Sequence, residues 1–120
     1  MKKEHLNKLL IKKFPKLETN YIDTVSWQEG GFTGSHVVYG DVLAPYLVEC
    51  ITSENIQETE EIFGFIEEIL LFNEEYSTNV IVCSVIEHIM HLLMEHDYLQ
   101  SRLGNISSSI FKNLKDSWNL

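Results

Sequence analysis

Apolar residues recur along most of this chain at intervals of three and four positions, which is the spacing of one face of an α-helix. No segment alternates apolar and polar residues over the length of a β-strand. The pattern predicts helices at about residues 3–13, 17–27, 41–52, 54–73, 77–95 and 106–117. A chain of 120 residues can bury one hydrophobic core. We therefore expect one all-α domain over residues 1–120, built of five to six helices as a helical bundle or as a short helix-repeat-like stack.

The expected helix boundaries are marked by residues that favour or oppose helix ends. Pro15 disfavours continuation of the first helix, and Asp41 and Ser53 have side chains that can cap the third and fourth helices. Asn105, after a break at Gly104, is expected to cap the last helix. An irregular stretch is predicted where glycines cluster, at Gly30, Gly31, Gly34 and Gly40.

The helix predicted at 77–95 is apolar around more than half of its circumference. Its apolar arc consists of Val82, Val85, Ile86, Ile89, Met90, Leu92, Leu93 and Met94. A helix that is apolar on several sides needs neighbours on several sides. We therefore expect this helix at the centre of the fold.

The helix predicted at 54–73 has two faces of different composition. The first is apolar and is assigned to the core: Ile62, Phe63, Ile66, Ile69 and Leu70. The second carries Glu54, Glu58, Glu61 and Glu68, with Phe65 and Phe72 beside them. Exposed aromatic side chains surrounded by charges of one sign are typical of a protein–protein interface. These six residues are our candidate partner-binding site; the alternative is that another helix covers both rings.

Charge is segregated along the chain. The segment between Lys16 and Arg102 contains no Lys or Arg but holds sixteen Asp and Glu residues, and the whole chain has a net charge of -9. A surface of this charge repels nucleic acid and anionic membranes, and it attracts a basic partner. The alternative interpretation is that the acidity only keeps a small protein in solution.

A narrow polar stripe on the 77–95 helix contains residues that can bind metals. Glu87, His88, His91 and Glu95 lie three or four positions apart, so their side chains can meet on one face of the helix. The sequence matches neither H-E-x-x-H nor the paired E-x-x-H motifs of di-iron bundles. We therefore expect no metal and no cofactor. A metal-binding protein or an enzyme that uses this stripe is kept as an alternative.

Nucleophilic catalysis has little support in the sequence. Ser35 and Ser84 each lie close to a histidine, but neither is flanked by the glycines of a nucleophile elbow. Cys50 and Cys83 fall on apolar helix faces, so we expect buried thiols that form no disulfide. We assign no catalytic residue and expect that the protein is not an enzyme.

Several short motifs resemble a family of bacterial proteins. They are Phe14-Pro15, Tyr39-Gly40-Asp41-Val42-Leu43, the segment IFGFIEE at 62–68 and the segment NVIVCSVIE at 79–87. The stretch that they mark covers about two-thirds of the chain, and it is similar to short all-helical bacterial proteins of unknown function. This resemblance implies an all-helical fold and carries no catalytic assignment. In size, charge and fold class the chain also resembles the immunity proteins encoded beside bacterial polymorphic and contact-dependent toxins.

The leading functional hypothesis is therefore a cytosolic immunity protein that binds and neutralises a basic toxin domain, with a nuclease as the first candidate. An adaptor for a different basic protein is the other interpretation of the acidic surface. A cytoplasmic location is expected because no stretch approaches the roughly twenty apolar residues of a membrane span. In addition, no apolar run of signal-peptide type follows the basic N-terminus.

Overall fold

A computed structural model describes residues 3–26 and 34–118, and within these ranges the chain forms helices and turns without any β-strand. The elements are α1 (Lys3–Lys13), a 3₁₀ turn (Pro15–Leu17), α2 (Glu18–Ser26), α3 (Ser35–Val38), a first π-helical segment (Tyr39–Leu43), α4 (Ala44–Thr52), α5 (Ile56–Leu71), α6 (Glu75–Val80), a second π-helical segment (Ile81–Ile86), α7 (Glu87–Glu95), α8 (Asp97–Gln100) and α9 (Asn105–Trp118). The predicted all-α fold is confirmed.

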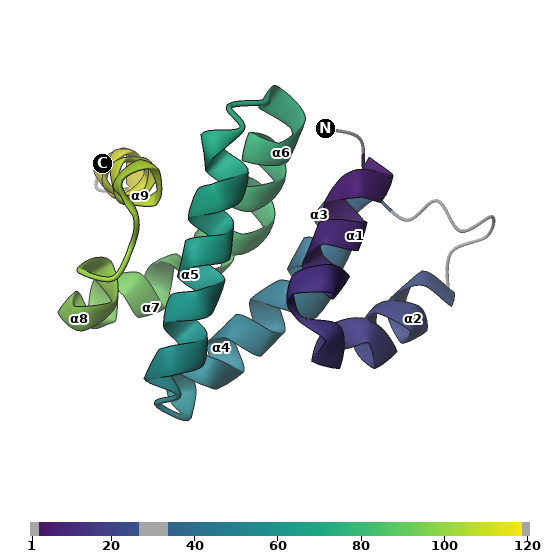
Figure 1. The fold of residues 1–120 in the computed structure, drawn as a ribbon. Helices are drawn as coiled ribbons and strands as arrows, with labels where there is room; N and C mark the ends of the chain where they lie inside the picture. Colours follow the sequence, from purple (N-terminus) through teal and green to yellow (C-terminus); the bar gives the residue numbers. More distant parts are fainter. Residues whose placement is uncertain (1–2, 27–33, 119–120) are drawn as a thin grey trace.

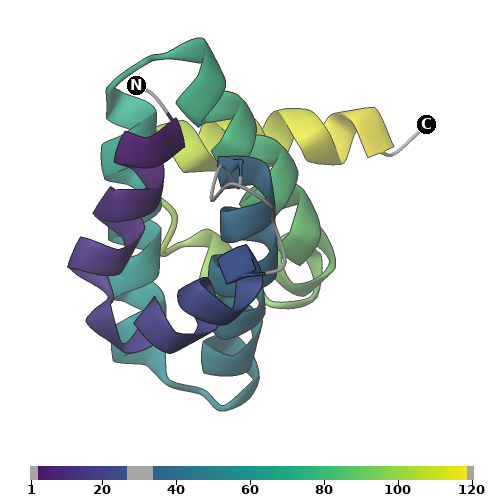
Figure 2. The same cartoon turned by 90° about the vertical axis from the view of Figure 1, so that its right-hand side faces the viewer.

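Two long continuous helices form the back of the molecule in Figure 1, and shorter helices pack around them. One runs through α3, the first π-helical segment and α4; the other runs through α6, the second π-helical segment and α7, and we call it the central helix (75–95). Helix α5 lies in front, between α9 on one side and α1 on the other (Figure 1). Figure 2 shows α9 lengthwise, where Figure 1 shows it end-on. Helix α9 therefore crosses α5 at a large angle.

The third helix begins earlier than the sequence indicated. It starts at Ser35, with Gly34 as the extended N-cap residue, so Asp41 lies inside the first π-helical segment and is not a cap. Gly40 is also helical, and a Cβ added there would lie 3.7 Å from the Cβ of Ser84 on the central helix. The predicted irregular stretch therefore ends before Ser35, and Gly30 and Gly31 lie outside the described residues.

The cap of α5 also differs from the prediction. The side chain of Asn55 accepts a hydrogen bond from the backbone N–H of Glu58 at 3.3 Å, and α5 begins at the next residue, Ile56. Ser53 instead ends the preceding helix, and Glu54 has a φ of 61° in the connecting turn. Asn and Ser are about equally favourable as N-cap residues, so the sequence pattern was compatible with either Ser53 or Asn55 as the cap.

The central helix is buried as predicted, with Ile86 and Ile89 only 2% and 1% exposed. The predicted buried arc is wrong at its two ends, where Val82 is half-buried and Met94 is 41% exposed. Before residue 82, Val80 and Ile81 are buried. A π-helical turn holds more residues than an α-helical turn, so the segment 81–86 rotates the first part of the helix relative to the 3.6-residue pattern.

The central helix also corrects the expectation about membrane spans. At 21 residues it is long and apolar enough to cross a membrane by length and composition alone, so the prediction that no stretch approaches a span was wrong. Half of its most apolar window is buried inside the structure. The same helix composition arises when a helix is the core of a folded domain.

The two cysteines have different environments. Cys50 is buried and burial raises the pKa of its thiol, whereas Cys83 is exposed, which corrects the prediction that both are buried. Cys83 lies in the second π-helical segment, so the same change of helical phase moves it out of the apolar arc. Both thiols are free, as expected.

Helix α9 is attached to α5 through one carboxylate. Glu67 of α5 accepts hydrogen bonds from the backbone N–H groups of Ile106 and Ser107, at 2.6 and 3.1 Å, and from the Ser107 hydroxyl at 2.7 Å. These amides belong to the first turn of α9, where they have no partner within the helix. A Cβ at Gly104 would lie 2.3 Å from the Glu67 side chain, so a larger residue there would displace this carboxylate.

We predict that Glu67→Ala lowers the free energy of unfolding by about 1–3 kcal/mol, because it leaves the first amides of α9 without an acceptor. Urea denaturation measures the change, and hydrogen exchange should quicken at the amides of Ile106 and Ser107. Glu68→Ala removes the neighbouring, exposed carboxylate and is the matched control, with a change within about 0.5 kcal/mol. Equal effects of the two variants would contradict the capping role of Glu67.

We also predict that Ile89→Asp unfolds the domain, because it places an unpaired charge in the core at a cost of about 4 kcal/mol or more. His88→Asp introduces the same side chain at the adjacent exposed position and should fold normally. Thermal denaturation followed by circular dichroism compares the two. A wild-type melting temperature for Ile89→Asp would show that the central helix is not the core element.

Candidate partner-binding surface

One face of α5 is open to solvent along the whole helix. The exposed positions recur every three or four residues, and we call them the outer face of α5: Gln57, Glu60, Glu61, Gly64, Glu68 and Leu71, with Phe72 as the C-cap. Helix α9 borders this face on one side and α1 lies on the other (Figure 1). The outer face carries three carboxylates and no basic side chain.

The candidate residues from the sequence divide into two groups. Glu61, Glu68 and Phe72 lie on the outer face of α5, and Phe72 is 53% exposed. Glu54 is exposed as well, but it lies in the turn before the helix rather than on the helical stripe. The predicted acidic and aromatic surface is therefore present at these four positions.

Phe65 is not an exposed anchor, which corrects the prediction. It is only 4% exposed. Its ring meets the ring of Phe14 edge-on at 5.5 Å between centroids and stacks against Tyr39 at 6.4 Å. The alternative that another helix covers the ring is right for Phe65 and wrong for Phe72. Phe65 lies on the side of α5 that turns toward Phe14, just after α1, so it contributes to the core.

Glu58 is the second correction, because its side chain is used inside the protein. The residue is 8% exposed, forms an ion pair with Lys16 and accepts a hydrogen bond from the Tyr46 hydroxyl. The hydrogen bonds from Lys16 and then from Tyr46 lower the pKa of the Glu58 carboxyl, and the same contact raises the pKa of Lys16. Burial, followed by the bond to Glu58, raises the pKa of Tyr46 to about 12.

The exposed apolar group on α5 is a pair of residues at the end of the helix, instead of the predicted pair of rings, Phe65 and Phe72. Leu71 is 66% exposed and stands next to Phe72; we call this pair the α5 tip. Asn73 follows with a φ of 53°, and the backbone N–H groups of Phe72 and Asn73 donate to Ile69 and Leu70. These bonds fix the backbone of the tip. Sequence reasoning missed Leu71, although its position three residues after Glu68 placed it on the outer face.

The polar stripe of the central helix does not form a metal site. Glu87, His88, His91 and Glu95 are all exposed. Within residues 3–26 and 34–118, no three His, Cys, Asp or Glu side chains are positioned to hold a metal ion. The geometry therefore gives the metal alternative no support.

A group of polar side chains that the sequence did not single out joins three helices. The Ser35 hydroxyl donates to the Asn7 side-chain oxygen at 2.8 Å, and the Ser35 backbone N–H donates to the Tyr76 hydroxyl at 3.1 Å. Nearby, Nδ1 of His36 lies 3.1 Å from the Ser84 hydroxyl, where α3 contacts the second π-helical segment. Asn7 and Ser35 are buried, so their bond satisfies polar groups inside the fold. That the protein is not an enzyme stays a prediction.

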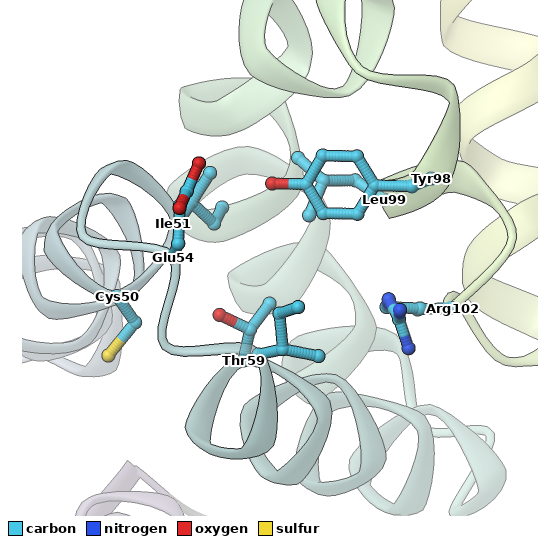
Figure 3. A pocket seen from close by; sticks show the side chains of 8 residues that line it. Cys50, Ile51, Glu54, Thr59, Tyr98, Leu99 and Arg102 are labelled. Carbon is cyan, nitrogen blue, oxygen red and sulfur yellow. The ribbon is translucent and has the colours of Figure 1, made fainter.

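Two hollows and one crevice mark the surface. A mostly apolar hollow of about 270 Å³ lies between α1 and α2, and a polar hollow of about 190 Å³ lies beside the first turn of α5. The crevice is shown in Figure 3, where Tyr98 and Arg102 face Ile51, Glu54 and Thr59. It does not admit a water-sized sphere, and Arg102 is held there by an ion pair with Glu60. The crevice is therefore a packed contact between neighbouring helices and turns rather than a ligand site.

Comparison with known families gives one result. The family model described as Domain of unknown function (DUF7674) matches residues 7–119. The chain belongs to this family. No curated protein and no solved structure matches it. The resemblance to all-helical proteins of unknown function is thereby borne out, and the function of this DUF7674 protein has to be argued from its surface.

The ion pair of Glu58 gives a pH-dependent prediction for this DUF7674 protein. A carboxyl whose pKa is lowered by folding stabilises the native state above its ordinary pKa of 4.5, and this stabilisation is lost as the pH falls through the lowered value. Wild type should therefore be more stable than Glu58→Gln at pH 7, and the difference should shrink below about pH 4.5. Urea denaturation from pH 2 to pH 7 measures it. Glu68→Gln, at an exposed position that does not contact Glu58, is the control, and a difference independent of pH would contradict the contact.

Proposed function

We propose that this DUF7674 protein is a bacterial immunity protein that binds a basic toxin domain in the cytoplasm and neutralises it. The observation that carries the proposal is the outer face of α5, where exposed Glu60, Glu61 and Glu68 lead to the apolar α5 tip. The chain from residue 17 to residue 101 contains no Lys or Arg. Arg102 pairs with Glu60, so Glu61 and Glu68 are the carboxylates of this face without a basic partner among the described residues.

The chemistry of the surface fits a nuclease as the toxin. A nuclease is basic where it grips phosphates, so an acidic protein can occupy that surface in place of nucleic acid. Exposed carboxylates accelerate the encounter by long-range attraction, which salt screens beyond about 8 Å at physiological ionic strength. Leu71 and Phe72 can then be buried in the complex, and buried apolar anchors mainly set its lifetime.

Of the two alternative functions, one would use the outer face of α5 and the other would use the polar stripe of the central helix. An adaptor for another basic protein would bind through the same outer face, and only the identity of the partner separates it from an immunity protein. A toxin reading frame next to this gene is expected for the immunity protein. An enzyme or metal protein would use Glu87, His88, His91 and Glu95, which no observation on the described residues favours.

The decisive experiment expresses the protein together with the toxin domain encoded by the adjoining reading frame. Wild type should restore growth of cells that make the toxin domain, and the purified pair should form a complex. A complex with no effect on the toxin's activity would favour the adaptor. The absence of any complex would overturn the proposal.

We predict that the double variant Glu61→Lys with Glu68→Lys slows association with this toxin domain at least tenfold and flattens its salt dependence. Both side chains are exposed, so the free energy of unfolding should change by only about 0.5 kcal/mol per site. Stopped-flow fluorescence at several salt concentrations measures the rate. The matched control is Glu87→Lys with Glu95→Lys, which makes the same charge change on the central helix. If the control slows association and the α5 variant does not, the interface lies on the central helix.

A further inference from the structure

Gly64 is in the middle of α5, where the fold has no need for a glycine. It is exposed, and a Cβ added there would meet no atom of the described residues within 4 Å. Its backbone is ordinary helix, without the positive φ that favours glycine. A glycine inside a helix costs about 1 kcal/mol relative to alanine. The internal packing of the protein therefore does not explain this residue.

The position of Gly64 on the surface is informative. It lies at the centre of the outer face of α5, one turn after Glu60 and Glu61 and one turn before Glu68. Because Gly64 has no side chain and a Cβ there would meet open space, the helix backbone between these carboxylates is open to approach. The apolar α5 tip lies two turns further along the same face.

We propose that Gly64 is the point at which a basic amphipathic helix of the partner crosses α5 at close range. The distance between two packed helices depends on the side chains at the crossing point, so a glycine there permits the closest approach. Lysines or arginines of the partner then meet Glu61 and Glu68 on either side of the crossing. Its apolar side chains cover Leu71 and Phe72.

The charge of the outer face favours a basic helix over other binding elements. The side chains of the outer face are carboxylates, an amide and apolar groups, and the basic group beside them, Arg102, is paired with Glu60. The face stays acidic, so a second copy of it is repelled. An uncharged helix would bury the carboxylates without partners, which is costly. The inference rests on the proposed function only in taking the partner to be basic, and it adds the shape of the partner's binding element and its crossing point.

The test uses a defined probe, a synthetic 20-residue helical peptide with lysines on one face and leucines at helical spacing on the other. Peptide binding to the ¹⁵N-labelled protein is followed by NMR, and a peptide with glutamine in place of every leucine is the control. We expect shifts at the amides of Gly64, Glu68 and Phe72 with the leucine peptide, and weaker binding of the glutamine peptide. Shifts confined to other helices, or no binding, would overturn the inference.

A second experiment distinguishes a glycine that is needed at an interface from a glycine that is needed for the fold. We predict that Gly64→Ala raises the melting temperature by about 4 °C, because alanine favours the helix. The same variant should weaken peptide binding at least fivefold, because the methyl group pushes the crossing helix away. Gln57→Ala, at the other end of the outer face, should leave binding within twofold. A lower melting temperature or unchanged binding for Gly64→Ala would contradict the inference.

The toxin domain of the preceding section distinguishes this inference from the function on which it rests. If Gly64→Ala still binds and neutralises the toxin domain like wild type while the Glu61 and Glu68 variant fails, the close crossing is wrong and the immunity function stands. If wild type does not bind the toxin domain but the peptide binds at Gly64, the immunity function is wrong and the helix-binding face stands.

Discussion

The burial of the central helix is the constraint on which the rest of this structure depends. Residues 75–95 are apolar around more than half of the helix, so neighbours have to cover it on several sides. The helix of residues 35–52 meets it where the two π-helical segments touch, and α5 and α9 pack on other sides. Burial of the central helix thus fixes where α5 lies, and with it which face of α5 remains in solvent.

Helix α5 uses its carboxylates for two different purposes. Glu58 and Glu67 face its two neighbours, where Glu58 binds Lys16 and Tyr46 and Glu67 binds the first turn of α9. These contacts hold α5 between the N-terminal helices and α9. Glu61 and Glu68 lie on the exposed side of the helix and give the outer face its charge. A stripe that looks uniform in the sequence is therefore partly structural and partly available to a partner.

Several exposed features of the outer face of α5 cost stability. Leu71 and Phe72 leave apolar area in water, and Gly64 weakens the helix without relieving any internal contact. Proteins accept such costs where a surface has a function that the isolated fold does not reveal. The same face carries more carboxylates than basic groups, since Arg102 pairs with one of them, Glu60, and this favours a basic binding partner over self-association.

The sequence by itself determined the helical fold, the central position of the 75–95 helix and the separation of charge. Helical periodicity and charge are local properties that can be read along the chain. It did not determine that Phe65 is covered while Phe72 is exposed, or that Glu58 is buried against Lys16 and Tyr46 while Glu61 stays exposed. The groups that decide these outcomes, Phe14, Lys16, Tyr39 and Tyr46, come from other helices and turns far along the chain. Only tertiary packing brings them to α5. The periodicity of the sequence identifies the faces of a helix, but it does not identify the neighbour that covers each face, and burial depends on that neighbour.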